Sequence, residues 1–519
     1  MGCSANLNIS KINIESNILN RKNSFIDQSF PPLNSSIFGE KNLEKIAKGI
    51  KIPHQKHFKD LLKDFSNNKI VWKRLKDIFN NKKYKLFSKN ISPKNIIQGS
   101  IGNCYFLTII SALTKFPSLL YQLFNTRKIS TNGSYEIYLK INNKISIIEL
   151  DDYFPYNLRT NKPVFCKSNN NEIFAMLLEK AFAKIKGCYI NLDNGTPVDA
   201  LDMVLLSSKL KKDVIYNFYS LKNDGDKDII WKNIFEKNKN ENTFMICLSK
   251  GKIKNKKKLK NFCYSIAEKH FYNIIDIVEK NEKFLLKLRN PWGFNKKNKN
   301  FNINIIENDF IIDINDERII KMEEEDILEE AEFIIDFNYF CYLFEEIQIY
   351  EIKNFLFNTY IEFIDENYKF EIIDINLKKS NLKGDIKIKI NLEDININDN
   401  DILNIMVLVI DKINMKVINK INNVIDIKKL ELIISLGLTY ELSSNYYICL
   451  FIHSGNGKKI LKGKKFHIVF QSEFYIDIIF NHHFYDDERL LDIIKEEINF
   501  SKCDINSLIY EKNCVEKEF

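Results

Sequence analysis

The 519-residue sequence lacks the features that define several large classes of protein. Its ten cysteines are scattered, with no C-x-x-C pair and no short regular spacing, so the pattern indicates neither a disulfide framework nor a zinc site. No apolar run approaches the ~18 residues of a membrane-spanning helix. The N-terminus has no apolar segment typical of a secretory signal. These absences predict a cytoplasmic, reducing setting, in which a lone cysteine is free to react.

The charged residues also lack the pattern of a nucleic-acid-binding surface. The chain has 77 basic and 68 acidic residues, and the resulting net charge of +9 is modest for its length. The densest basic stretches, 252–260 and 296–300, contain no interleaved aromatic residues that could stack on bases. We therefore interpret both as solvated loops and expect no nucleic-acid partner.

The first six residues, MGCSAN, permit lipid attachment. Gly2 followed by Cys3 is the arrangement for myristoylation with palmitoylation, and two acyl chains give stable membrane anchoring where one does not. The usual Ser or Thr is missing, because Asn6 stands in its place. Membrane association through Gly2 and Cys3 is one interpretation, and an ordinary frayed terminus is the other.

Composition and periodicity divide the chain into five segments. We expect a flexible polar lead over 1–23 and mixed helices and strands over 24–205. Short apolar runs separated by polar clusters indicate an antiparallel sheet over 206–347. Strands separated by frequent turn signals predict a β-sandwich over 348–480. Residues 481–519 are interpreted as an amphipathic helix with a polar tail.

Five elements within these segments have clear patterns. FAMLLEKAFAKI (174–185) combines good helix formers with an apolar face and contains no Gly or Pro, which predicts a helix. Four short apolar runs in the sheet segment predict strands: 213–219, 242–249, 270–278 and 284–290.

One stretch, QGSIGNCYFL, places a cysteine at a predicted helix start. Gly99 and Gly102 permit a tight backbone path, Asn103 is a good N-cap residue, and Tyr105–Leu113 has the pattern of a buried helix. Unpaired backbone N–H groups in the first turn would favour a thiolate at Cys104. The alternative is a small, inert core residue, since free cysteines are usually buried.

A histidine and an asparagine are predicted to meet across a hairpin. Two strands that turn at EKNE (279–282) would pair residues whose numbers add to about 560. His270 would then lie opposite Asn290, and a carboxamide can hold an imidazole in one tautomer. Trp292 would shield this hydrogen bond from water. The alternative for NPWG is a strand-ending turn with a core tryptophan.

These residues resemble the motifs of a known family. QGSIGNCYFLTIISALTKFP resembles the cysteine motif of the calpains, and KHFYNIIDIVEKNEKFLLKLRNPWG resembles their histidine and asparagine motifs. IELDDYFP, NEIFAMLLEKAFAKIKGCY and EAEFIIDFNYFCYLF follow in the order of the calpain core. The similarity spans residues 24–347 and extends more weakly over 348–480.

The resemblance implies an α+β fold: a papain-like core of two subdomains, then a β-sandwich. The helical first subdomain would carry Cys104, and the antiparallel second subdomain His270 and Asn290. The implied activity is intracellular, limited proteolysis of protein substrates in extended conformation. Cys104 would be the nucleophile, His270 the general base and then acid, and Asn290 the group that orients it. Gln98 would donate to the oxyanion together with the Cys104 backbone N–H, and Trp292 would shield the pair.

The resemblance also implies calcium as an activator, although the chemistry requires no cofactor. In the first of two sites Glu172 matches an acidic ligand, whereas Asn95 stands where an Asp is expected. In the second, Glu330 and Glu332 match an acidic pair, but Lys296 occupies a position expected to be acidic. We therefore expect the second site to be weak or absent.

Two further readings of the chain remain open. One is a catalytically silent calpain-like scaffold, associated with a membrane surface through its N-terminus or its sandwich. The other is acyl transfer to an amine, against which the Asn-Pro-Trp-Gly setting argues. Lys269 and Phe271 depart from the family pattern, which has Gly and a small residue around the histidine.

Overall fold

The structure, a computed structural model, describes most of the first 353 residues and the strands beyond them. The described residues are 24–52, 59–80, 82–88, 90–125, 128–206, 213–221, 227–251, 266–280, 283–293, 306–307, 310–311, 331–353, 355–362, 368–377, 386–392, 402–412, 415–426, 431–436, 445–454, 465–472, 476–480 and 490. The chain divides into two compact units, Met1–Ile352 and Lys353–Phe519. The predicted boundary between 347 and 348 falls inside strand β13 (Phe344–Ile352).

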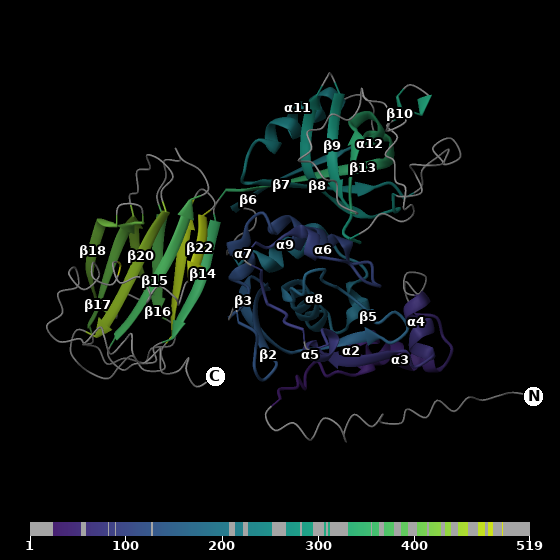
Figure 1. Cartoon of the computed structure of the whole chain (residues 1–519), viewed down its shortest axis with the longest axis horizontal. Helices are drawn as coiled ribbons and strands as arrows, with labels where there is room; N and C mark the ends of the chain where they lie inside the picture. Colours follow the sequence, from purple (N-terminus) through teal and green to yellow (C-terminus); the bar gives the residue numbers. More distant parts are fainter. Residues whose placement is uncertain are drawn as a thin grey trace, which may run out of the picture. The chain divides into compact units, whose positions relative to one another are not determined.

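Helices dominate residues 24–206, called here the helical region, which runs from purple to blue in Figure 1. The α-helices are α2 (Asn34–Phe38), α3 (Glu40–Ala47), α4 (Lys59–Ser66), α5 (Leu75–Ile78), α6 (Cys104–Leu113), α7 (Pro117–Tyr121), α8 (Phe174–Ile185) and α9 (Pro197–Val204). Two 3-10 turns, η1 (Pro93–Asn95) and η2 (Tyr189–Leu192), lie between them. The helix predicted over 174–185 is confirmed as α8.

Two small antiparallel sheets accompany these helices. The order of the first is β1-β4-β5, and β2 pairs with β3 in the second. The strands are β1 (Ile70–Arg74), β2 (Ser134–Ile141), β3 (Lys144–Asp151), β4 (Tyr153–Asn157) and β5 (Lys162–Pro163). Helices α6 and α8 are buried along almost their whole length, so they form the centre of the helical region.

A six-stranded antiparallel sheet forms the second part of the first unit, called here the sheet region (213–352). Its order is β12-β9-β8-β7-β13-β6, and its strands beyond β13 are β6 (Val214–Ser220), β7 (Thr243–Ser249), β8 (Phe271–Lys280), β9 (Lys283–Arg289) and β12 (Glu332–Asp336). The four strands predicted from the sequence are therefore confirmed. A short pair, β10 (Ile306–Glu307) and β11 (Phe310–Ile311), is separate.

Two helices of the sheet region, α11 (Lys227–Asn238) and α12 (Phe337–Leu343), were not predicted. They contribute to one core with the sheet. Trp231 of α11 stacks on Phe284 of β9 at 4.6 Å between ring centroids and also contacts Phe337 of α12 at 5.2 Å. The apolar residues of α11 therefore find partners only once the sheet has formed.

The helical and sheet regions join through α6 and polar side chains. Helix α6 contacts β7 and β8. Asn273 of β8 donates through Nδ2 to the carbonyl of Thr108 at 2.9 Å, and Lys115 donates to the carbonyl of Thr243 at 2.7 Å. The helix that begins at the cysteine is thus fixed against the strand that follows the histidine.

The second unit contains two antiparallel sheets, shown in green to yellow in Figure 1. The first has the order β14-β21-β16-β19: β14 (Phe355–Glu362), β16 (Ile386–Leu392), β19 (Glu431–Leu436) and β21 (Lys465–Ser472). The second has the order β18-β17-β20-β15-β22: β15 (Tyr368–Leu377), β17 (Ile402–Asp411), β18 (Lys416–Asp426), β20 (Asn445–Ser454) and β22 (Ile476–Phe480). With the first unit, this makes the chain an α+β protein.

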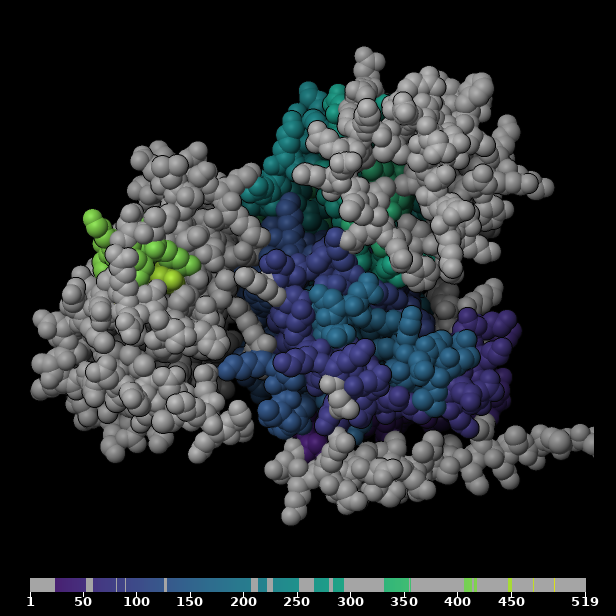
Figure 2. All heavy atoms as spheres, in the orientation of Figure 1, coloured from purple at the N-terminus to yellow at the C-terminus, as the bar shows by residue number. Residues whose placement is uncertain are grey.

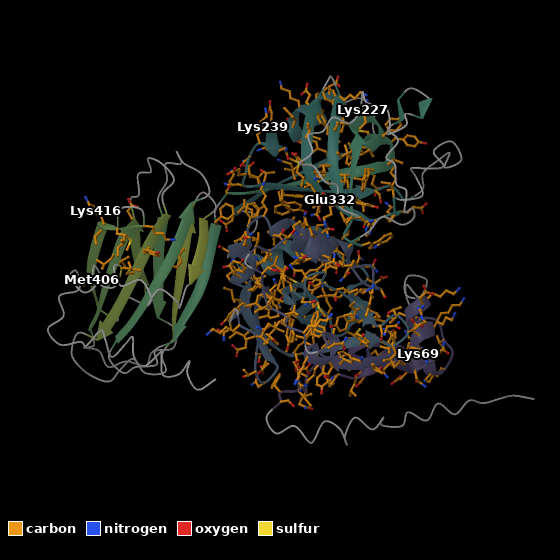
Figure 3. The ribbon with its side chains drawn as sticks, viewed as in Figure 1. Lys69, Lys227, Lys239, Glu332, Met406 and Lys416 are labelled. Atoms are coloured by element: carbon orange, nitrogen blue, oxygen red, sulfur yellow. The ribbon has the colours of Figure 1, made fainter. Side chains whose placement is uncertain are left out.

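Side chains are described mainly in the first unit, as the coloured atoms of Figure 2 and the sticks of Figure 3 show. No helix among the described residues is long and apolar enough to span a membrane. The two basic stretches, the proposed lipidation residues Gly2 and Cys3, and all of the predicted C-terminal helix except Leu490 lie outside the described residues.

Candidate active site

Cys104 is the first residue of α6, and Asn103 precedes it at the N-cap position. The predicted N-cap position of Asn103 is confirmed, but its side chain forms no cap hydrogen bond. Asn103 donates instead through Nδ2 to Oε1 of Glu179 at 2.7 Å. The first turn of α6 therefore keeps backbone N–H groups available beside the thiol.

The Cys104 thiol is buried, with 8% of the residue exposed. Burial raises its pKa to about 11, while the backbone N–H groups of Phe271, Tyr105 and Cys104 lower it. The thiolate expected from the helix terminus is thus not favoured in this arrangement, because desolvation outweighs the N–H groups. The isolated thiol needs a base.

His270 and Asn290 meet, as the sequence led us to expect. The ring Nε2 of His270 lies 3.1 Å from Oδ1 of Asn290, and both residues are buried. A carbonyl oxygen only accepts, so Nε2 carries the proton and Nδ1 keeps its lone pair as a base. Burial lowers the pKa of His270 to about 4, and the hydrogen bond to Asn290 raises it. The imidazole is therefore neutral at pH 7.

Trp292 lies against the same pair. Its ring centroid is 4.5 Å from that of His270, at a tilt of 40°. Its backbone N–H also donates to Oδ1 of Asn290 at 3.0 Å, so the asparagine oxygen accepts from two sides. This arrangement keeps water from the His270–Asn290 hydrogen bond.

The predicted register of the hairpin that carries the pair is wrong. Strand β8 pairs Glu279 with Phe284 and Lys280 with Lys283, so the residue numbers add to 563. A bulge between Ile274 and Asp276 changes the register nearer the site. His270 precedes β8 and Asn290 follows β9, and their side chains meet beyond the ladder.

The Gln98 side chain is buried beside the two motifs. Its Nε2 donates to the carbonyl of Ile101 at 2.7 Å, and its backbone N–H donates to the carbonyl of Pro291 at 2.8 Å. The amide has a second N–H, and its Oε1 accepts no hydrogen bond from the described residues. The backbone bond connects Gln98 to the turn that follows Asn290.

Ser249, which the sequence did not indicate, and Lys269, which departs from the family pattern, both lie against His270. The Ser249 hydroxyl accepts from the backbone N–H of His270 at 3.0 Å. Lys269 has a φ of +49°, the left-handed region that glycine adopts at low cost, and its ammonium pairs with Glu345 at 2.5 Å. The glycine that the family pattern has here would adopt this φ without strain, and this signal was readable in the sequence.

No hydrogen bond joins Cys104 to His270, both of which the structure describes in full. The thiol instead lies within reach of the Phe271 backbone N–H, next along the chain from the histidine. The thiol and the imidazole are therefore neighbours that are both neutral.

The two residues of the first implied calcium site come together through a hydrogen bond. Asn95 donates through Nδ2 to Oε2 of Glu172 at 2.9 Å, and the backbone N–H of Ser88 donates to Oε1 at 2.6 Å. Both carboxylate oxygens thus already accept hydrogen bonds, and the pair offers one negative charge. Calcium favours several oxygen ligands, so this pair could supply only part of such a site, and calcium at this position stays a prediction.

The second implied site is only partly described. Glu332 of β12, labelled in Figure 3, pairs with Lys287 of β9 at 3.1 Å. Glu330 and Lys296 lie outside the described residues. Within the described part of the chain, no group of three or more His, Cys, Asp or Glu side chains could hold a metal ion.

Comparison with known proteins agrees with the motifs. The calpain family cysteine protease domain matches residues 25–351, which include Cys104, His270 and Asn290. A buried thiol at a helix start, beside a histidine held by an asparagine, is the arrangement of a cysteine protease. The chain belongs to the calpain family of cysteine proteases.

Curated relatives are similar over part of their length. Calpain-5 of Caenorhabditis elegans is 32% identical over 194 residues, which cover 36% of this chain and 26% of the relative. Calpain-5 of Mus musculus is 34% identical over 143 residues, 25% of this chain and 22% of the relative. The calpain-type cysteine protease DEK1 of Arabidopsis thaliana is 26% identical over 209 residues, 40% of this chain and 9% of the relative. The matched part thus spans about a quarter or less of these relatives.

Proposed function

We propose that this protein is an active intracellular calpain-like endopeptidase that cuts protein substrates at extended segments. The observation that carries the proposal is the buried His270–Asn290 hydrogen bond, 3.1 Å long and covered by Trp292. It leaves Nδ1 as the basic nitrogen on the ring that neighbours Cys104. In support, the proposed subdomains of a papain-like core correspond to the helical and sheet regions, and the two sheets of the second unit suit a calpain-type β-sandwich.

The proposed reaction uses these residues in sequence. His270 Nδ1 takes the thiol proton, and Cys104 Sγ attacks the scissile carbonyl. The Cys104 backbone N–H and the free N–H of the Gln98 amide donate to the oxyanion, at about 3–4 kcal/mol per donor in comparable sites. His270 then gives its proton to the leaving amine, and water hydrolyses the acyl-enzyme. Asn290 holds the ring throughout.

Calcium takes no part in this chemistry. The hydrogen-bonded Asn95–Glu172 pair argues against a calcium requirement at that position. We propose that any calcium activation acts through other residues, and that the protein works in the cytoplasm, with membrane association through Gly2 and Cys3 as a separate proposal. Activity in calcium against activity in chelator tests the first, and incorporation of a clickable myristate analogue tests the second.

The test of the main proposal is digestion of casein by the full chain and by Cys104→Ala. We expect cleavage by the wild type and none by the variant, which should keep its thermal midpoint within a few degrees. Equal cleavage by both proteins would contradict the proposal.

A catalytically silent scaffold is the second candidate, and one observation favours it. The Cys104 thiol lies beside the backbone N–H of Phe271 and has no hydrogen bond to His270. Labelling by a peptidyl epoxide separates the two candidates, because only an assembled cleft directs such a reagent to Cys104. Wild-type protein that is neither labelled nor active would be a scaffold.

A further inference from the structure

The mechanism above leaves one buried acid beside the nucleophile without a role. Glu179 lies on α8, and only 1% of it is exposed. Within the described residues it forms no ion pair, and Lys167 is the cation that stabilises its charge at longer range. Burial raises the pKa of Glu179 to about 7, against two hydrogen-bond donors that lower it. Burying a carboxylate without an ion pair costs free energy, so a function that requires it here would explain its presence.

Its two oxygens join two segments of chain. Oε1 accepts from the Asn103 side chain at 2.7 Å, and Oε2 accepts from the backbone N–H of Cys166 at 2.8 Å. Both partners are donors, so the position demands two acceptors. A carboxylate supplies them, whereas a glutamine supplies one acceptor and one donor.

The two segments lie directly against each other. The backbone N–H of Ser100 donates to the carbonyl of Val164 at 3.0 Å. A Cβ added to Gly99 would come within 2.3 Å of the Phe165 carbonyl oxygen, so the backbones are in close contact. Asp193 holds the same loop from another direction, because its Oδ1 accepts from Gly102 N–H at 2.9 Å.

Cys104 follows Asn103 directly, so whatever fixes Asn103 fixes the start of α6. The Asn103 side chain is fully buried and does not cap the helix, which leaves Glu179 as its polar anchor. We propose that Glu179 is a positioning residue for the nucleophile: it sets where Cys104 Sγ lies relative to the histidine by holding Asn103. This inference rests on the proposed protease function.

The experiment exchanges the two partners. Glu179→Met and Asn103→Asp each break the match between donors and acceptors. Glu179→Gln alone does not, because the Asn103 amide can turn its Oδ1, which has no partner among the described residues, toward the new amide. The double variant Asn103→Asp with Glu179→Gln restores it, because the new amide at position 179 can donate to the new carboxylate at position 103 and its oxygen can accept from Cys166. The double variant also keeps one carboxyl in the pair. Asp64→Asn is the matched control, since Asp64 is a buried carboxylate that accepts from Asn157 away from the site.

Three quantities are measured on the full chain: kcat and KM for a peptide substrate, the rate of Cys104 alkylation by iodoacetamide, and the thermal midpoint. We expect each single variant to lower kcat and the alkylation rate by about 10- to 100-fold, in line with the cost of misplacing a reacting group. KM should change by less than about twofold, because substrate contacts stay. The double variant should return to within about threefold of wild type.

The control should lose thermal stability and keep its kcat. Wild-type kcat and alkylation in Glu179→Met would overturn the proposal, as would a folded double variant no faster than the single variants. If Glu179→Met does not fold, the double variant decides, and failure of both to fold would make Glu179 a core residue only. Alkylation needs no peptidase activity, so a wild type that is alkylated but cuts nothing refutes the protease function separately.

Discussion

The helical region and the sheet region hold their halves of the candidate site by different means. Cys104 is fixed through a buried polar network, in which Glu179 and Asp193 bind the loop before α6. His270 is fixed at the end of a β-ladder, by Asn290 and the ring of Trp292. The cysteine half therefore depends on charges in a low-dielectric interior, and the histidine half on strand pairing and aromatic packing. Substitutions should separate the two.

The largest effect is expected from Asn95→Asp in the helical region. It places two carboxylates in a buried hydrogen-bond position, and an uncompensated buried charge costs about 3–5 kcal/mol. We expect a loss of that size in the free energy of unfolding at pH 8, measured by urea denaturation. Acidification to pH 5 should recover most of it, since one carboxyl then carries a proton.

Asn157→Asp is the matched control for this prediction. It also places an acid against a buried carboxylate, that of Asp64, but the Arg159 guanidinium binds Asp64 at 2.8 Å. Its loss of stability should be clearly smaller. Equal losses in the free energy of unfolding would contradict the prediction, because they would show that the carboxylate pair at Asn95 costs no more than the pair that Arg159 neutralises.

The titration of His270 gives the next effect. Its folded pKa of about 4 lies below the usual 6.5, so the unfolded chain binds the proton first as the pH falls. The stabilisation is complete above pH 6.5 and is lost progressively toward pH 4, by about 3 kcal/mol at about 1.4 kcal/mol per pKa unit. We expect wild type to lose this much more stability than His270→Gln between pH 7.5 and 4. Parallel curves would refute the assignment.

Asn290→Ala should lower kcat by about 10²-fold, because the His270 ring loses its orientation. KM should change by less than about twofold, because the contacts with the substrate stay. A pH–rate profile on the full chain measures both. Asn157→Ala, which removes a buried asparagine far from the site, serves as control and should leave kcat unchanged. A kcat near wild type in Asn290→Ala would mean that Trp292 alone orients the ring.

The smallest effect concerns Lys269. Because its φ is +49°, Lys269→Gly should be more stable than Lys269→Ala by about 1 kcal/mol, the reverse of the usual order. Both variants remove the ion pair with Glu345, so their difference isolates the backbone. The same pair of substitutions at Glu268, which has no positive φ, should give the usual order.

Local pattern was enough to predict α8 and the four strands, because their apolar residues repeat at the helical or strand period. It failed for α11, whose buried apolar residues Ile230, Trp231 and Ile234 are few and pack on a sheet built from distant segments. The hairpin register failed for another reason. The ladder continues to the pair Lys280–Lys283, so the hairpin is centred later in the chain than EKNE suggested, and the bulge changes the sum of paired residue numbers only from 563 to 562.

The candidate site shows the same division. The histidine and asparagine could be found because one hairpin carries both. The partner of Asn103 could not, because Glu179 is 76 residues away and meets it only through the fold. The one signal in the sequence was a charged residue in the apolar run of α8, which invites the question of what neutralises it.

Three of the hydrogen bonds between the helical and sheet regions share a further property. Asn273, Lys115 and Arg289 donate through their side chains, and the acceptors are the main-chain oxygens of Thr108, Thr243 and Ile96. A main-chain oxygen is present whatever residue occupies the position. The three donor positions should therefore tolerate few substitutions. The acceptor positions should tolerate any residue that the local packing permits. A deep mutational scan would detect this difference as more damaging substitutions at the three donor positions than at the three acceptor positions.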